Sequence, residues 1–269
     1  MSRLGHEART ALMVWNRELI RFRRNPARIV TSFVQPVLYL FVLGYGLGSF
    51  VNSQGGPSYR QYLFPGSVAM NIISTAIFSG VSIVWDREFG FLREMLVAPV
   101  SRASIILGKL FGGAVTATVQ GCVMLLLAPV IGVKLTWLSA LGFAAGAFLM
   151  AFALTAFGVF VASRMKKMEG FQVVMQFLLF PMIFLSGVMF PVRGLPGWLT
   201  FLTRINPLTY AVDPLRRILL GAKAAAATGL ASGVTLFGHV LPVWGEFAIV
   251  AGFAAAFLTA AIATFGRAE

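Results

Sequence analysis

A stretch of mixed charge, WDREFGFLREMLVAPVSR at residues 85–102, interrupts the long hydrophobic runs of this chain. Asp86 is a residue type that caps helix N-termini, and Pro99 is a type that ends helices. Apolar residues recur at helical spacing between them, which predicts a short helix over 86–98. Its charged residues suit docking to a soluble protein, and the alternative is a solvated helix at the membrane surface.

No side chains gather at spacings that suit catalysis or metal binding. Cys122 is the single cysteine, which excludes an intrachain disulfide, and His6 and His239 lack acidic or thiol partners at ligand spacing. The pair Gly108-Lys109 lacks the upstream glycine of a phosphate-binding loop. We therefore expect no enzyme activity and no bound cofactor in this chain, so that ATP and magnesium, if they drive it, bind to a partner subunit.

The composition is that of a membrane protein. Of the 269 residues, 58% are hydrophobic and 12% are charged, whereas a soluble domain has roughly 25% charged residues. The net charge of +13 comes from basic clusters between uncharged runs. We infer that the basic clusters set the orientation of the chain in the membrane, and we expect no nucleic acid partner.

Six runs almost free of charge are long enough to cross a hydrocarbon core of ~30 Å as helices. The predicted spans are residues 30–51, 63–84, 110–133, 138–163, 171–191 and 246–266. The expected fold is an all-α membrane protein with a single domain over 1–269. A seventh uncharged stretch, 224–245, is a weaker candidate because its glycines, proline and hydroxyl groups insert less well.

The basic residues predict the orientation of these spans. Fifteen Lys and Arg residues fall on the side that holds the N-terminus, and seven fall on the other side. Basic residues favour the cytoplasmic side, so we expect a multi-pass protein of the cell (inner or plasma) membrane with both termini in the cytoplasm. A seventh span would move the C-terminus to the opposite side.

The N-terminal stretch predicts an amphipathic helix over 4–24. Trp15 belongs to its apolar face, whereas Arg17, Arg21 and Arg24 gather away from that face. A helix of this kind lies at the cytoplasmic membrane surface. It either anchors the chain to anionic lipid or braces a cytoplasmic partner.

Short helices are also predicted over 197–221, before the last span. Asn206 followed by Pro207 is a helix start, and Asp213 and Arg217 have the i, i+4 spacing of an ion pair. An apolar stripe runs along the same segment, which favours helices that enter the outer leaflet over an extended loop. They either plug the outer face or gate a pathway.

Polar side chains within the spans have two interpretations. They line a wetted pathway for cargo, or they form hydrogen bonds between packed helices. The candidates are one helical stripe and two glutamines: Ser67, Asn71, Thr75, Ser79, Gln172 and Gln176. The pairs Gly44-x3-Gly48 and Gly142-x3-Gly146 indicate close helix packing without identifying the partner.

Two segments resemble the permease subunits of ABC type 2 exporters, in particular the drug-resistance and nodulation-factor export branch. These are FLREMLVAPVSR, followed by IILGKL, after the second span, and INPLTYAVDPLRRILLG before the last. The resemblance extends over nearly the whole chain in length, span order and basic N-terminal helix. It implies a dimer of permeases, homodimeric or heterodimeric, with two separate ATP-binding subunits.

The resemblance also implies roles for particular segments. The predicted helix 86–98 would be a coupling helix in a cleft of the ATPase, and the N-terminal helix would brace the same subunit. The coupling residues would be Asp86, Arg87, Glu88, Arg93, Glu94, Pro99 and Arg102. The re-entrant outer helices that cap the pathway would carry Asn206, Pro207, Tyr210, Asp213 and Arg217.

The implied cargo is hydrophobic or amphipathic, such as a drug, an antibiotic or a lipid-like molecule moved outward. A permease for a lipid-linked saccharide or polysaccharide is an alternative. A membrane scaffold or channel subunit that pumps nothing is another, since the polar stripe and the missing ATP site would permit it.

Overall fold

Helices form along the uncharged runs because hydrocarbon offers the backbone no hydrogen-bond partner, so the bonds must close within each segment. The computed structural model describes residues 3–46, 58–90, 101–189, 195–221, 235–236 and 239–265. The elements on the N-terminal side are α1 (Arg3–Arg23), α2 (Pro26–Leu38), a π-helical turn (Tyr39–Leu43), α3 (Gly44–Gly46), α4 (Tyr59–Ser79), α5 (Val81–Glu88), α7 (Arg102–Met124), a 3-10 turn (Leu125–Leu127) and α8 (Ala128–Ile131). They are followed by α9 (Trp137–Arg164), α10 (Met168–Leu185), α11 (Gly197–Ile205), α12 (Pro207–Leu220), β1 (Thr235–Leu236), β2 (His239–Val240) and α14 (Val243–Phe265).

Six helical stretches of the described chain are long and apolar enough to cross a membrane. They are Ile29–Gly46, Tyr59–Glu88, Arg102–Ile131, Trp137–Arg164, Met168–Leu185 and Val243–Thr264. The prediction of an all-α membrane protein with six spans is therefore confirmed. The third helix begins eight residues before the predicted span, at Arg102, and so includes Lys109.

The seventh candidate span, 224–245, is not a continuous helix. Its described part forms a two-residue antiparallel pair in which Thr235 faces Val240 and Leu236 faces His239. Residues 222–234 and 237–238 lie outside the described chain. An extended pair at this place excludes a helix through the stretch, because its glycines and proline favour turns over helix.

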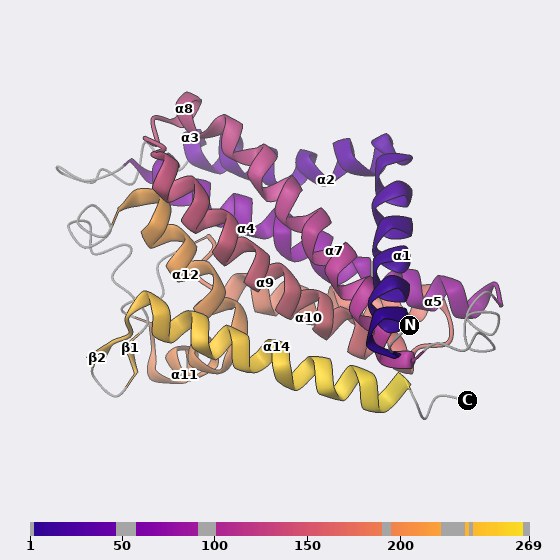
Figure 1. Cartoon of the computed structure of the whole chain (residues 1–269). Coiled ribbons are helices and arrows are strands. Elements are labelled where there is room, and N and C mark those ends of the chain that lie inside the picture. The colour runs from indigo at the N-terminus through magenta and orange to yellow at the C-terminus, as the bar shows by residue number, and fades with distance from the viewer. Residues whose placement is uncertain are drawn as a thin grey trace.

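The bundle has two ends and a buried centre (Figure 1). Helix α1, helix α5 and the C-terminal end of α14 lie at one end, whereas α8, α11 and the β1–β2 pair lie at the other. The span formed by α4 and α5 is the most enclosed, with 72% of its apolar window buried. The spans of α2, α10 and α14 are only 17–22% buried, so lipid or another protein must cover them.

Two glycines let the central helices cross almost in backbone contact. A Cβ atom at Gly80, between α4 and α5, would lie 2.6 Å from the backbone carbonyl carbon of Gly158 in α9. A Cβ at Gly158 would in turn run into the carbonyl oxygen of Ile77. No side chain fits at this crossing, which is a close approach of the kind that small residues permit in membranes.

We predict that Gly158→Ala lowers the stability of the protein. The new methyl group must displace the α4 backbone, and overpacking of this kind costs ~1–3 kcal/mol. Thermal unfolding in detergent measures the effect. Gly252→Ala in α14 is the matched control, since nothing lies within 4 Å of a Cβ at that position. Equal unfolding temperatures for the two variants would contradict the proposed backbone contact.

Candidate functional site

Asp86 does not cap a new helix, and the predicted helix over 86–98 is wrong at its start. Asp86 lies in the last turn of α5, which follows α4 after a short break at Gly80. The helix ends at Glu88, and Gly90 has φ +80°, a left-handed conformation that stops a helix. The cap signal misled because the apolar residues before Asp86 are themselves helical, so the second span continues through it.

A cluster of four ionised side chains joins α1, α5 and α7, and we call it the ion cluster. Its members are Arg17, Glu18, Asp86 and Lys109. Lys109 Nζ lies 2.6 Å from Asp86 Oδ2 and 3.4 Å from Glu18 Oε1, while Arg17 donates to Asp86 Oδ2 at 2.9 Å. The Lys109 ammonium also donates to the Ser82 hydroxyl at 3.1 Å.

The ion cluster is nearly dry at its centre. The side chains of Lys109 and Asp86 are 1% and 7% exposed. Burying an ion costs several kcal/mol unless partners surround it. The two positive and two negative groups balance, so the cluster is stable only while α1, α5 and α7 stay together.

Two glycines of α7 allow α1 to come close enough for these contacts. A Cβ at Gly108 would lie 2.7 Å from the carbonyl oxygen of Ala11, and one at Gly112 would lie 2.8 Å from Cβ of Glu18. The pair Gly108-x3-Gly112 is the same small-residue spacing that sequence reasoning noted elsewhere. This spacing is the sequence signal for the contact of α7 with α1.

The remaining residues of the N-terminal helix prediction have different surroundings. The indole nitrogen of Trp15 is buried, and its ring lies beside the Gly112 position. The guanidinium of Arg21 lies 4.9 Å from the ring centre of Trp85 in α5, a cation–π contact. Arg24 follows the end of α1 and is exposed.

Helix α5 also binds the connection between α9 and α10. Arg87 donates to the carbonyl oxygens of Ser163 at 3.0 Å and Met165 at 2.8 Å. The carboxylate of Glu88 accepts a hydrogen bond from the Met168 backbone N–H at 3.2 Å. Asp86 thus contacts α1 and α7, whereas Arg87 and Glu88 contact the α9–α10 connection.

Of the other predicted coupling residues, the structure describes only Arg102. Arg93, Glu94 and Pro99 lie outside the described residues. Arg102 is the exposed first residue of α7, after Ser101, whose hydroxyl oxygen caps the helix by accepting from the Ser104 N–H. Helix α5, which ends just before residues 91–100, lies at the end of the bundle that carries α1 (Figure 1).

A polar cavity of about 650 Å³ adjoins the ion cluster. Helices α1, α2, α4, α5, α7 and α10 surround it. Its polar lining consists of Glu18, Arg21, Asn25, Thr31, Ser32, Ser74, Thr75, Ser79, Ser82, Thr116, Gln120 and Gln172. The hydroxyl and amide groups predominate, so the cavity can hydrogen-bond an uncharged polar group.

The predicted pathway residues divide between the two interpretations. Thr75, Ser79 and Gln172 line the polar cavity. Asn71 instead donates to the Ser32 carbonyl oxygen at 2.8 Å, and Ser67 donates to a carbonyl of its own helix. The remaining candidate, Gln176, is exposed and is not among the residues that line the cavity.

Gln120 and Thr116 of α7 line the polar cavity and were not predicted. The Thr75 hydroxyl donates to the side-chain oxygen of Gln120, which joins α4 and α7 at the cavity wall. Their helical spacing of four was the only sequence signal. It does not reveal which helix α7 faces.

At the opposite end, Asn206 connects three segments. Its side-chain oxygen accepts from the Leu208 N–H at 3.1 Å, which caps α12, and its amide donates to the Met182 carbonyl in α10 at 2.6 Å. Pro207 occupies the first turn of α12, as the sequence predicted. Tyr210 donates to the Arg204 carbonyl at 2.7 Å, and burial raises the pKa of this phenol, which keeps it a neutral donor.

Arg217 links α12 to the last span. Its Nε donates to Asp213 at 2.7 Å, which is the ion pair that the i, i+4 spacing predicted. The guanidinium also pairs with Glu246 in the first turn of α14 and donates to the Leu241 carbonyl at 2.9 Å. No local spacing in the sequence indicates this second pair, because Arg217 and Glu246 lie 29 residues apart.

The chain is similar to known membrane proteins along most of its length. Residues 10–220 match the family model described as ABC-2 type transporter. Nodulation protein J of Rhizobium meliloti (strain 1021) is 30% identical over 214 residues, covering 78% of this chain and 81% of that protein. The putative transport permease ycf38 of Cyanophora paradoxa is 29% identical over 204 residues, covering 74% and 70%. Nodulation protein J of Neorhizobium galegae is 25% identical over 240 residues, covering 88% and 91%.

We predict that Lys109→Met destabilises the protein by ~3–5 kcal/mol, the cost of leaving a buried charge without its partner. Asp86 would retain Arg17, whose side chain is 45% exposed and therefore compensates only in part. Chemical unfolding in detergent measures the change. Lys134→Met is the matched control, because Lys134 is exposed in the connection between α8 and α9.

A second variant separates the ion pair from simple loss of packing. Lys109→Met combined with Asp86→Leu removes both buried charges and leaves Arg17 and Glu18, 3.8 Å apart, to pair with each other. The double variant should be more stable than Lys109→Met alone. Additive losses from the two substitutions would show that the cluster acts as separate contacts.

Proposed function

Because this chain belongs to the ABC-2 type transporter family, we propose that it is the membrane permease of an exporter driven by a separate ATP-binding subunit. The family and the six apolar helices indicate a multi-pass membrane protein that functions in transport. The finer proposal is that it moves a hydrophobic or amphipathic cargo outward. The coupling to an ATP-binding subunit is argued most directly from the ion cluster, which joins α5 to α1 and α7.

We propose that the end of the bundle with α1 faces the cytoplasm and that the protein resides in the cell membrane. Basic residues concentrate there, and the positive-inside rule supports that side. The basic residues of the described chain lie in or next to α1, in α5, at the start of α7 and around the α9–α10 connection that Arg87 binds: Arg17, Arg21, Arg23, Arg24, Arg87, Arg102, Arg164, Lys166 and Lys167. Both termini then lie in the cytoplasm.

The segment between Gly90 and Ser101 is the proposed docking site for the ATP-binding subunit. It leaves α5 and enters α7, and both helices meet at the buried pair of Asp86 and Lys109. A force on this segment would therefore reach α7 through the ion cluster and α9 through the bonds of Arg87. Interfaces that are bistable and well packed transmit displacements of this kind.

A second copy of the permease is proposed to cover α2 and α10. Each helix carries an apolar face that the chain itself leaves open. The exposed residues are Val30, Val34 and Leu38 on α2, Val42 in the π-helical turn that follows α2, and Val173, Phe177, Phe180 and Phe184 on α10. Both helices also line the polar cavity, so pairing here would enclose it between two copies, each with its own ATP-binding subunit.

The lining of the polar cavity bears on the cargo. We propose an amphipathic molecule such as a drug, an antibiotic or a lipid-like compound. The many hydroxyl and amide groups favour an uncharged polar head, which also supports the alternative of a lipid-linked saccharide. A scaffold that binds no cargo would need no such cavity.

Charge reversal tests the docking proposal. We expect Arg93→Glu combined with Glu94→Arg to abolish co-purification with the ATP-binding subunit, because reversed charges meet like charges in the cleft. Lys134→Glu, at the other end of the bundle, should leave co-purification unchanged. If the reversed variant elutes as a folded protein and still retains the ATP-binding subunit, this segment is not the docking site.

Cargo is tested by ATP hydrolysis in reconstituted vesicles. We expect a drug, a lipid or a lipid-linked saccharide to stimulate the complex, and Thr75→Val combined with Gln120→Leu to raise the half-maximal concentration of that compound roughly tenfold, or ~1.4 kcal/mol. Gln176→Leu is the control, since Gln176 does not line the cavity. Hydrolysis that no compound stimulates, with no transport, would favour the scaffold.

A further inference from the structure

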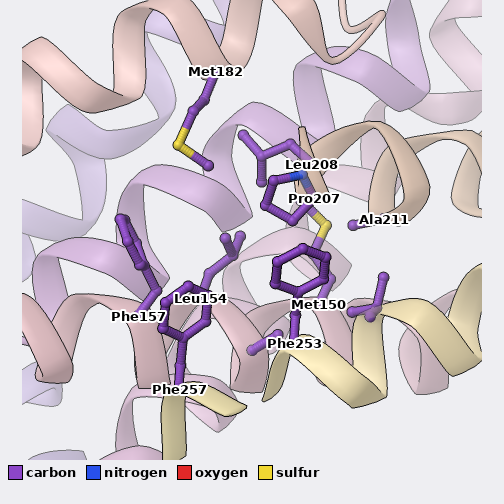
Figure 2. Close-up of a pocket in the computed structure, with 11 residues that line it drawn as sticks. Met150, Leu154, Phe157, Met182, Pro207, Leu208, Ala211, Phe253 and Phe257 are labelled. Carbon is purple, nitrogen blue, oxygen red and sulfur yellow. The ribbon is translucent and has the colours of Figure 1, made fainter. Parts of the chain in front are cut away.

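A second cavity, entirely apolar in its lining side chains, lies between the last span and the outer helices (Figure 2). Its volume is about 180 Å³. Side chains of α9, α10, α12 and α14 line it. Figure 2 shows Met182 of α10 opposite Phe257 of α14. The principal lining residues are Met150, Leu154, Met182, Leu208, Phe253 and Phe257.

The chemistry of this cavity excludes a polar ligand. Its lining side chains contain carbon and two thioether sulfurs, and the ring of Pro207 replaces a backbone N–H at the wall. Water needs two to four polar partners, and apolar cavities of ~150 Å³ stay dry and bind a compact hydrocarbon such as benzene. The cavity therefore suits a hydrocarbon group of about that size.

The position of the cavity indicates where such a group comes from. Helices α10 and α14, which form two of its walls, are among the least buried spans, at 22% and 17%. Phe253 and Phe257 line the cavity and are themselves partly exposed. In a membrane the exposed side of α14, which the proposed contact with a second copy leaves free, contacts lipid chains, so the most concentrated hydrocarbon at the cavity is the bilayer itself.

The apolar cavity is separate from the polar one. Among the helices that line either cavity, only α10 borders both, through Met168 and Gln172 at one end and Met182 at the other. A molecule in the apolar cavity would touch Pro207, Leu208 and Ala211 in the first turns of α12. It would thus fill the space beneath the outer helix rather than the proposed cargo path.

We propose that this cavity binds the end of an acyl chain from a bilayer lipid, which stays in place as a wedge between α12 and α14. The chain end would complete packing that the side chains leave open, where voids forfeit dispersion contacts. It would support α12 beside the bond of Asn206 to Met182 and the ion pair of Arg217 with Glu246.

Photolabelling tests the proposal without an ATPase or a cargo. The protein is reconstituted in phosphatidylcholine vesicles that contain a phosphatidylcholine with a diazirine near the end of one acyl chain. After irradiation, mass spectrometry should find label on Met150 and Leu154, which are 1% and 5% exposed and so out of reach of lipid on the outer surface. Label confined to exposed residues such as Leu141, which is 63% exposed, would overturn the proposal.

Two variants fill the cavity from different helices. Ala211→Leu and Ala153→Leu should each lower the label on Met150 and Leu154 at least about tenfold, because added carbon occupies the space of the chain end. Two variants are used so that, if one fails to fold, the label on the other still tests the proposal. Ala255→Leu, on the exposed side of α14, is the matched control and should leave the label unchanged.

The remaining arm distinguishes the source of the hydrocarbon. A small phenyldiazirine, free in the same vesicles, replaces the lipid probe. Label on Met150 from this probe together with none from the lipid probe would assign the cavity to a free apolar molecule and overturn the lipid proposal. Unchanged label in both filled variants would show that neither probe enters the cavity.

Discussion

The ion pair between Asp86 and Lys109 constrains the end of the bundle where α1, α5 and α7 meet. Each side chain is almost inaccessible to water, so its charge is tolerated only with partners in place. Arg17 and Glu18 of α1 supply two of those partners. The N-terminal helix is consequently part of the membrane domain's own structure, because its removal would leave buried charges unbalanced.

The end of the bundle with the ion cluster also holds the polar cavity. Helix α5 is bonded to α1, α7 and the α9–α10 connection, and the polar cavity lies directly beside it. At the other end, Asn206 and Arg217 tie α12 to α10 and α14 around the apolar cavity. Between the two ends, the crossing of Gly80 and Gly158 holds α4 and α9 in backbone contact.

Local signals predicted much of the fold. The uncharged runs indicated the six spans, and Asn206 followed by Pro207 indicated the start of α12, because hydrocarbon thickness and helix capping act over short stretches of chain. The Asp86 cap failed for the same reason that the others succeeded. A cap rule considers a few residues, whereas the second span extends through Asp86 with its apolar side buried.

The sequence by itself determined the class of protein, the number of spans and the ion pair of Asp213 with Arg217, which lie one helical turn apart. Only the tertiary structure decided that Asp86 meets Arg17, 69 residues away, and that Arg217 also meets Glu246. Hydrophobicity and helical period are properties of one segment, so they can be read along the chain. The partner of a buried charge depends on where two helices cross, and that crossing is set by glycines and side-chain volumes on both.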